Sequence, residues 1–406
     1  MKNMGRLTTG KLEQARALIT AAGVDVWMTF VRETAEGADP VLPLIIEGGL
    51  TWQSALFVAR DGRRVAVVGN YDADPLRASG DWDEVIPYVE GIRQPLREVL
   101  ERLIPASARP PRIALNWSLD DAKADGLSYG MALFLENTLK GTRFEGSLVS
   151  AEGIVGGLRS RKIPEELRRI RAAVRVTEEI LREVPRFAAA GRSEREVYDW
   201  IQQRMTERNL GFSWDRRNDP IVNTGPDSMI GHGIPSDTIR IAPGHFFHLD
   251  FGVLYDEYAS DLQRTWFVRR PGETDLPEDV SRAFRAVHGA ISEGAALLRP
   301  GIEGWSVDEA ARRFLTSAGY PEYQHALGHQ VGRMAHDGGA ILGPRWERYG
   351  KTPMIPIERD QVFTLELGVI VDGRGYVGLE EMVVITETGC EWLSERQNEV
   401  LILESA

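Results

Sequence analysis

The sequence predicts an α/β domain over residues 1–157, followed by an α+β domain over residues 158–406. Three observations support this prediction. The chain has 406 residues, which exceeds the roughly 100–200 residues of one domain, so two or three domains are expected. Short apolar runs typical of strands alternate with helical segments over about the first 150 residues. After Pro164, longer amphipathic helices are separated by strands with flanking glycines.

The elements of the first domain follow from apolar spacing. Apolar residues at helical spacing predict helices, and short uninterrupted apolar runs predict strands. Asp61 and Gly62 separate two of these runs and suit the turn of a hairpin. The predicted elements are, in order, helix 9–22, strands 26–30, 54–60 and 64–69, helix 92–104, strand 112–117 and helix 129–139.

The second domain is predicted to begin with a helix at Pro164, because proline is favoured in the first helical turn. Leu167, Ile170, Val174 and Leu181 then form an apolar stripe. We place the domain boundary near residues 155–162. Further amphipathic helices are expected at 192–209, 277–298 and 306–318.

Composition excludes several classes of partner. Hydrophobic residues make up 43% of the chain and charged residues 27%, as in ordinary globular proteins. Asp and Glu total 60 against 48 Lys and Arg, and a net charge of −12 disfavours nucleic acid. No apolar run is long enough for a signal peptide or a membrane span, and Cys390 is the single cysteine. A soluble cytoplasmic protein without nucleic-acid or membrane partners is expected.

Two predicted hairpins carry opposed acids. All seven histidines lie between residues 232 and 336, around the first of these hairpins. Its strands, 245–254 and 258–268, would place Asp250 opposite Asp261. Like charges in such a position destabilise a sheet, so a shared proton or a cation is expected between them. Two acids on a partly solvated hairpin are the plain alternative.

The second hairpin repeats this arrangement. Runs 363–371 and 375–386 flank a three-residue turn, and Glu366 would face Glu380. Glu366 lies in an apolar run, where charged residues are rarely buried unless they are paired. With His329 as a fifth ligand, four carboxylates favour Mn, Co, Fe or Zn over the thiolate-bound metals, and would suit a pair of ions.

At these positions the sequence resembles metallopeptidase family M24, and within it the Xaa-Pro peptidases, prolidase and aminopeptidase P. The resemblance covers about residues 158–400. It implies a pita-bread fold for the catalytic domain, and a looser likeness to the creatinase-like N-terminal domain of this family. The segments that carry it are, in order, SRKIPEELRRI (160–170), LDFG (249–252), YASDLQRT (258–265), HALGH (325–329), TLELG (364–368) and LEEMV (379–383).

The resemblance also implies a set of ligands for two divalent ions, with manganese expected and cobalt, zinc or iron as alternatives. Asp250 would chelate one ion, and His329 and Glu366 the other. Asp261 and Glu380 would bridge the two, and Glu381 would project to the opposite face of its strand.

Catalytic roles are implied in the same way. His232 matches a histidine that lines the substrate site, and His325 and His336 match two that contact the peptide and the tetrahedral intermediate. Glu366 would accept the proton of the attacking water. His245, His248 and His288 match no role, so we expect them to be structural.

The expected function is hydrolysis of the Xaa-Pro bond in dipeptides or short peptides, by a homodimer or higher homo-oligomer. One alternative is a related hydrolase or lyase of a small nitrogen- or sulfonium-containing metabolite, and another is a non-catalytic binding module. Family Xaa-Pro peptidases commonly carry an arginine where this chain has Gly378. Residues 31–50 are either a loop that helps to close a neighbouring active site or a plain connector.

Overall fold

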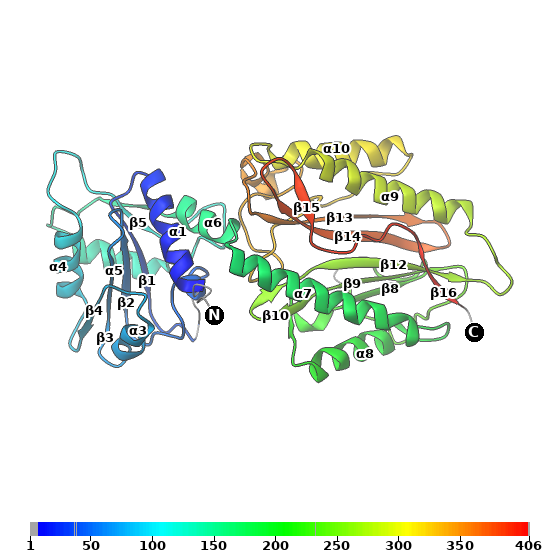
Figure 1. Ribbon diagram of the computed structural model, residues 1–406, viewed down its shortest axis with the longest axis horizontal. Coiled ribbons are helices and arrows are strands. Elements are labelled where there is room, and N and C mark those ends of the chain that lie inside the picture. Colours follow the sequence, from blue (N-terminus) through cyan, green and yellow to red (C-terminus); the bar gives the residue numbers. More distant parts are fainter. Residues whose placement is uncertain (1–6, 36, 38, 232, 405–406) are drawn as a thin grey trace. The chain divides into compact units, whose positions relative to one another are not determined.

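The computed structural model describes residues 7–35, 37, 39–231 and 233–404 (Figure 1). Contacts divide the chain into two compact units, Met1–Arg159 and Ser160–Ala406. This division falls within helix α6 (Glu152–Ser160). That residues 1–157 and 158–406 are separate domains stays a prediction. No helix in the described part of the chain is both long and apolar enough to cross a membrane.

The N-terminal unit contains a mixed six-stranded sheet in the order β4-β3-β2-β1-β5-β6. Strands β1, β2 and β3 pair antiparallel, and the remaining neighbours are parallel. The predicted hairpin around Asp61 and Gly62 is therefore confirmed. The strand bounds are β1 Val26–Val31, β2 Ser54–Ala59, β3 Arg64–Gly69, β4 Glu84–Tyr88, β5 Ile113–Leu115 and β6 Leu148–Ser150.

Helices cover both faces of this sheet. Every residue of β1 is buried, because Trp27 and Val31 face one hydrophobic cluster while Val26, Met28 and Phe30 face another. Such two-sided burial explains why the strands are continuous apolar runs rather than alternating ones. The helices are α1 Leu7–Ala21, α2 Leu42–Ile45, α3 Ala73–Ser79, α4 Arg93–Leu103, α5 Tyr129–Leu139 and α6. Of these, α2, α3 and α6 were not predicted from the sequence.

Much of segment 31–50 belongs to the core of this unit. The segment contains α2, and Leu42, Leu44 and Ile45 are buried. Asp39 is also buried, where it accepts hydrogen bonds from the side-chain amide of Asn116 (2.8 Å) and the backbone N–H of Val41 (3.0 Å). Residues 47–49 near the end of the segment are exposed, as are Arg32 and Glu33 near its start, which line a cavity of about 650 Å³.

The C-terminal unit contains a seven-stranded sheet in which five strands follow the order β13-β14-β12-β9-β8, while β15 pairs with β14 and β16 with β12. A smaller sheet has the order β11-β10-β7. The bounds are β7 Gly211–Phe212, β8 Ile221–Thr224, β9 Phe246–Phe251, β10 Val253–Tyr255, β11 Tyr258–Ala259, β12 Leu262–Arg269, β13 Val362–Val371, β14 Gly375–Ile385, β15 Cys390–Trp392 and β16 Leu401–Glu404.

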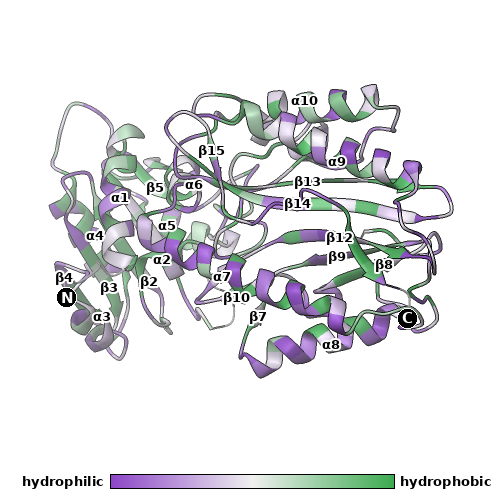
Figure 2. Ribbon diagram, turned by 45° about the vertical axis from the view of Figure 1, so that its right-hand side comes forward, coloured by the Kyte–Doolittle hydropathy of each residue, from purple (hydrophilic) through white to green (hydrophobic). Residues whose placement is uncertain are grey.

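Two helix pairs flank the strands of this unit. Figure 1 shows α9 and α10 along β13 and β14, with α7 and α8 on the side of β8, β9 and β12. Hydrophilic residues mark the outer faces of α7 and α8 in Figure 2, whereas the strands are mainly hydrophobic. The helices span α7 Pro164–Glu183, α8 Glu194–Glu207, α9 Glu278–Leu297 and α10 Gly304–Ser317, which confirms the four helices predicted for this region.

Strand β13 separates the core from a polar face. Its residues Leu365, Leu367, Val369 and Val371 pack with α9 and α10 in one hydrophobic cluster. Because side chains alternate along a strand, Glu366 must lie on the opposite face. The alternation thus puts an acidic side chain on the inner surface of the sheet, away from the helices that cover its other face.

Candidate metal centre

A row of polar side chains crosses four strands of the C-terminal sheet. In the register of the sheet, Asp250 on β9 faces Gln263 on β12, Gln263 faces Glu380 on β14, and Glu380 faces Glu366 on β13. Neighbouring strands lie about 4.8 Å apart, so these side chains share one face at one level. The sheet therefore collects three carboxylates and one amide from segments that are distant in the sequence.

The predicted pairing of Glu366 with Glu380 is confirmed. The ladder of β13 and β14 runs without interruption from Val362 opposite Val384 to Val371 opposite Gly375. Residues 372–374 form the turn, with Gly373 at φ 68°. A three-residue turn fixes the register of the hairpin. Local sequence alone therefore brings these two glutamates together.

The predicted pairing of Asp250 with Asp261 is wrong by two residues, because Asp250 faces Gln263. The turn of the first hairpin contains only Asp256 and Glu257, at φ 49° and 67°, between the paired residues Tyr255 and Tyr258. This turn centre lies one residue later than predicted. Asp261 nevertheless lies beside the row, because one of its carboxylate oxygens lies within 4.8 Å of one on Glu380, and the carboxylate of Asp250 is close enough to raise the pKa of Asp261.

The ladder of this first hairpin is also broken at Gly252. A Cβ atom there would lie only 2.0 Å from the backbone oxygen of Ser260, so no larger residue fits. The break separates β9 from β10 and lets the chain before Asp261 approach the opposite strand closely. The tertiary arrangement at Gly252 therefore helps to bring Asp261 to the carboxylate row.

His329 reaches the row from a loop that runs beside β13. The backbone N–H of Thr364 donates to the oxygen of His329 (2.9 Å), and that of Glu366 donates to the oxygen of Leu327 (2.7 Å). Gly328 permits this approach, since a Cβ there would lie 2.0 Å from the backbone oxygen of Thr364. These contacts hold the imidazole beside Glu366.

Asp308 on α10 anchors the start of the same loop. Its carboxylate accepts two hydrogen bonds from Arg312 (3.0 Å each) and one from the backbone N–H of Leu327 (3.0 Å). Arg312 also donates to the backbone oxygen of His325 (3.0 Å). The ion pair therefore fixes the backbone that carries both His325 and His329.

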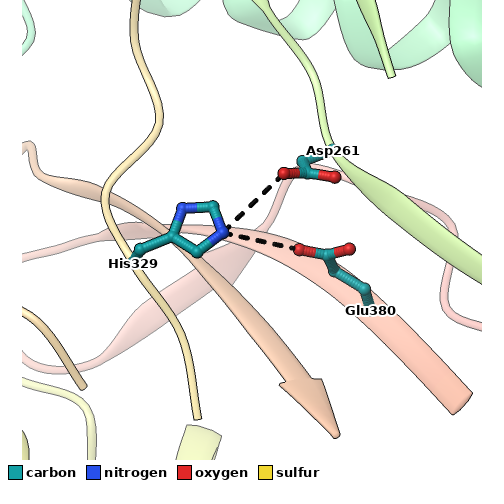
Figure 3. A group of neighbouring side chains, drawn as sticks. All are labelled: Asp261, His329 and Glu380. Carbon is teal, nitrogen blue, oxygen red and sulfur yellow. Dashed lines mark ion pairs between the residues drawn. The ribbon is translucent and has the colours of Figure 1, made fainter. Parts of the chain in front are cut away.

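Nε2 of His329 points at three carboxylates. It lies 3.3 Å from Oε1 of Glu366, 3.7 Å from Oδ2 of Asp261 and 4.0 Å from Oε1 of Glu380. Figure 3 shows the imidazole facing Asp261 and Glu380 from across the row. One ligand atom from each of Asp261, His329 and Glu380 can be chosen so that all three lie within 4.8 Å of one another. This spacing is suited to a divalent ion.

Burial and mutual repulsion disfavour the ionised acids. Burial raises the pKa of Asp250, Asp261 and Glu380 well above its ordinary value, and the neighbouring carboxylates raise it further. Asp219, a buried acid before Pro220, adds to the repulsion at Asp250 and Asp261, and burial raises its own pKa to about 8. Without a cation, burial and repulsion therefore favour the protonated forms of Asp250, Asp261 and Glu380.

Glu366 behaves differently. Burial acts to raise its pKa, but the contact with His329 and the imidazoles of His325 and His336 outweigh that effect, so the pKa is lowered. Its Oε2 accepts a hydrogen bond from the side-chain amide of Gln263 (3.0 Å). Glu366 is therefore the acid of the row that most readily stays ionised.

Several buried ligand atoms at the cluster have no protein partner. Among the residues that the structure describes, Oδ1 of Asp250 and both carboxylate oxygens of Glu380 make no hydrogen bond. Buried oxygens in this condition are costly unless an ion or water satisfies them. Carboxylate and imidazole donors are also the ligands preferred by Mn, Fe, Co and Zn. The residues present therefore fit divalent metal ions.

Glu381 does not belong to the cluster. Its carboxylate pairs with Arg264 (3.1 Å) and accepts hydrogen bonds from the Ser394 hydroxyl (2.6 Å) and the Gln397 backbone (2.8 Å). These contacts lie on the opposite face of β14, as the alternation predicts. Of the two adjacent acids, only Glu380 faces His329.

The structure describes two of the three other predicted histidines, His325 and His336. The His336 ring lies 4.2 Å from that of His329, centre to centre, and is exposed. His325 is half-buried, and its Nδ1 donates to the backbone oxygen of Ala326 (2.7 Å). His232 lies outside the described residues, so its predicted role stays a prediction. The structure therefore places one of these histidines directly at the cluster.

Two residues at the site were not predicted to take part. Gln263 bonds Glu366 and also has its Oε1 3.0 Å from Nε2 of His248, which the sequence left as structural. Nδ1 of His248 lies 3.2 Å from Oδ1 of Asn223. A signal was available: His248 lies two residues before Asp250, and Gln263 two after Asp261, so each shares a strand face with a predicted ligand.

Known proteins are similar to this chain in sequence and in fold. A sequence profile described as metallopeptidase family M24 matches residues 168–387. The chain is 29% identical over 251 residues to the Xaa-Pro dipeptidase of Pyrococcus furiosus, covering 62% of this chain and 67% of that protein. The structure of dipeptidase PepE from Mycobacterium ulcerans matches with a TM-score of 0.73 and 25% identity, over 98% of this chain and 100% of that one. An Xaa-Pro dipeptidase from Bacillus anthracis has the same fold (TM-score 0.72, 22% identity, 98% and 100% coverage).

Proposed function

Because the chain belongs to metallopeptidase family M24, we propose that it hydrolyses the Xaa-Pro bond of dipeptides or short peptides with the help of two divalent metal ions. Its C-terminal unit has the pita-bread fold of that family. The observation that carries the proposal is the convergence of Asp261, His329 and Glu380 on one small volume. The names of the relatives, Xaa-Pro dipeptidases among them, support the choice of substrate.

The proposed ligands divide into three roles. Asp250 would help to hold one ion and His329 and Glu366 the other, with Asp261 and Glu380 as ligands shared between them. The position of an Asp261 oxygen within 4.8 Å of ligand atoms of both His329 and Glu380 supports a central position for it. We propose manganese as the native metal, because these hard oxygen donors suit it, while cobalt, zinc and iron also fit.

Two bound ions would acidify a water molecule and polarise the scissile carbonyl group. The residues of the chain supply the rest of the proposed chemistry. Glu366 accepts the proton of the attacking water, since it lies beside His329 and is held by Gln263. His336 donates a hydrogen bond to the developing oxyanion.

His325 is proposed to contact the peptide in a different way. Its Nδ1–H is used by the backbone oxygen of Ala326, so the neutral ring presents an unprotonated Nε2. That nitrogen can accept a hydrogen bond from an N–H of the substrate. His232 is proposed to line the same substrate site, on the resemblance alone.

A substrate panel tests the proposal. Xaa-Pro dipeptides, Xaa-Pro tripeptides and matched Xaa-Ala peptides are incubated with the manganese-loaded protein, and products are quantified by mass spectrometry. Cleavage confined to the Xaa-Pro peptides is expected. If all of them remain intact while the protein holds two equivalents of metal, the proposed substrate is wrong.

Gly378 favours keeping a second candidate. No guanidinium group is available there to bind a substrate carboxylate, and a glycine cannot replace that bidentate contact. A hydrolase or lyase of a small nitrogen- or sulfonium-containing metabolite would not need it. Adding such compounds to the panel separates the two candidates, because only one of them requires a peptide bond.

We also propose a cytoplasmic homodimer or higher homo-oligomer. The single cysteine supports a reducing compartment, and the likeness to the family supports the oligomer. Light scattering coupled to size-exclusion chromatography tests the assembly directly, since a mass equal to the 45.3 kDa chain would contradict it.

A further inference from the structure

A hydrogen-bonded chain runs from His248 through Gln263 to Glu366. Nε2 of His248 lies 3.0 Å from Oε1 of Gln263, and Nε2 of Gln263 lies 3.0 Å from Oε2 of Glu366. The amide N–H₂ of Gln263 faces Glu366, and its carbonyl oxygen faces the imidazole of His248.

This chain is shielded from water. His248 and Gln263 are exposed to only 3% and 5%, and the ring of His248 packs edge-on against Tyr376 with centres 4.9 Å apart. A buried amide or imidazole that loses its partner leaves an unsatisfied polar group. Solvent therefore cannot easily replace either residue.

Gly378 provides the space that the chain occupies. A Cβ atom at this position would lie 2.8 Å from Oε1 of Gln263, 2.9 Å from Nε2 of His248 and 2.4 Å from the ring of Tyr376. Real Cβ atoms almost never approach other atoms so closely. The absence of a side chain at position 378 is thus tied to the presence of the His248–Gln263 pair.

The two oxygens of Glu366 are used differently. Oε2 is held by Gln263, while Oε1 lies 3.3 Å from Nε2 of His329, on the side of the other carboxylates. Fixing one oxygen of a carboxylate fixes the direction of the other. The amide thereby aims Oε1 at the place where His329 and the bridging acids converge.

We propose that His248 and Gln263 are positioning residues of the metal centre, which orient Glu366 as a ligand and proton acceptor, and that Gly378 is a glycine in order to admit them. This proposal rests on the proposed two-metal site, but not on the identity of the substrate. Partners of metal ligands typically contribute about 10- to 100-fold to metal affinity.

Cobalt titration of the metal-free protein tests this role. Gln263→Met keeps the length of the side chain but removes the amide, and His248→Leu removes the imidazole that contacts Gln263. Both variants are expected to bind the weaker of two cobalt equivalents about 10- to 100-fold less tightly, and to change the visible cobalt spectrum. His248→Gln replaces the ring with an amide N–H, and is expected to restore the affinity to within about threefold of the wild type.

Gln397→Met is the matched control. Gln397 is also exposed to 5% and bonds the backbone of Thr265 on β12, and none of its described hydrogen bonds reaches a proposed ligand. Its variant is expected to lose stability while keeping cobalt affinity and spectrum. Equal losses of cobalt affinity in Gln397→Met and Gln263→Met would show that Gln263 has a merely structural role, and would overturn the proposal. Wild-type affinity and spectrum in Gln263→Met would overturn it as well.

Failure of the proposed function gives a different pattern. A wild-type protein that binds two cobalt equivalents but cleaves no Xaa-Pro peptide refutes the substrate and leaves the cobalt comparison valid. A wild-type protein that binds no cobalt refutes the metal centre itself, and the positioning role with it. If His248→Leu does not fold, the nearly isosteric Gln263→Met decides the question.

Discussion

Nζ of Lys162 lies 2.9 Å from Oδ2 of Asp337, and both side chains are buried, with 0% and 3% exposed. Asp337 directly follows His336, and its backbone N–H donates to the oxygen of Gln330 (2.9 Å). The ion pair therefore joins the start of the C-terminal unit to the part of the loop that carries His329 and His336. A buried pair in this place makes the loop sensitive to changes far from it in the sequence.

Lys162→Met should strongly destabilise the C-terminal unit. The substitution breaks the buried ion pair between Lys162 and Asp337, which costs about 3–5 kcal/mol of unfolding free energy. Urea unfolding measures the loss. Arg171→Met, which breaks an exposed ion pair with Glu391, is the control and should change the unfolding free energy by less than about 1 kcal/mol. Similar losses in the two variants would contradict the prediction.

Asp261→Ala and Glu380→Ala should each abolish binding of at least one metal ion and reduce hydrolysis below detection. Both residues face His329 and are the proposed shared ligands. Elemental analysis after loading and dialysis measures bound metal, and circular dichroism checks the fold. Asp372→Ala removes an exposed acid from the turn of the same hairpin as Glu380 and should behave as wild type. Full metal content in Glu380→Ala would refute the assignment.

His336→Ala should lower kcat by about 100-fold or more while changing KM little, because an oxyanion contact acts mainly in the transition state. Steady-state kinetics on an Xaa-Pro dipeptide give both constants. His288→Ala is the control, since the imidazole of His288 hydrogen-bonds Asn398 (3.2 Å), which is not a proposed site residue. A rise in KM of similar size, with kcat unchanged, would assign His336 to substrate binding instead.

Metal-free protein should lose stability as pH rises. Burial raises the pKa of Asp250, Asp261 and Glu380, whereas unfolded acids titrate near about 4. For a group whose folded pKa is raised, the stabilising contribution is complete below the unfolded pKa and is lost as pH rises through the folded pKa. Bound divalent ions favour the ionised acids and remove this loss.

The increase in melting temperature that metal produces should therefore become larger as the pH rises. The comparison is between protein with MnCl₂ and protein with EDTA, from about pH 5 to about pH 8. The difference between the two samples cancels the pH dependence of all other groups. A gain that stays constant or narrows over this range would show that the three acids are already ionised without metal.

The sequence predicted most of the elements and part of the site. Helices were predicted from apolar spacing, and α9 at 278–297 differs by one residue at each end from the predicted 277–298. The pairing of Glu366 with Glu380 was also predicted correctly, because a three-residue turn sets the register of an unbroken hairpin. Short elements such as α2 and α3 were missed, because an element with so few residues is too short to show a periodic pattern.

The first hairpin shows where this reasoning fails. Its turn at Asp256 and Glu257 adopts positive φ angles at residues that are not glycine, and its ladder is broken where Gly252 meets Ser260. Neither feature can be predicted from the alternation of apolar and polar residues. The carboxylates still converge, but they do so through the neighbouring strand β14 rather than by facing each other.

By itself, the sequence determined which residues are acids and imidazoles, on which strand faces they lie, and how one hairpin is aligned, because these depend on local periodicity and turn length. Only the tertiary structure decided that His329 lies beside Glu366, that Gln263 occupies the centre of the row, and that His248 fills the space above Gly378. Those contacts join segments many residues apart. They depend on close backbone approaches at Gly328 and Gly252. At both positions the packed structure leaves no room for a larger side chain.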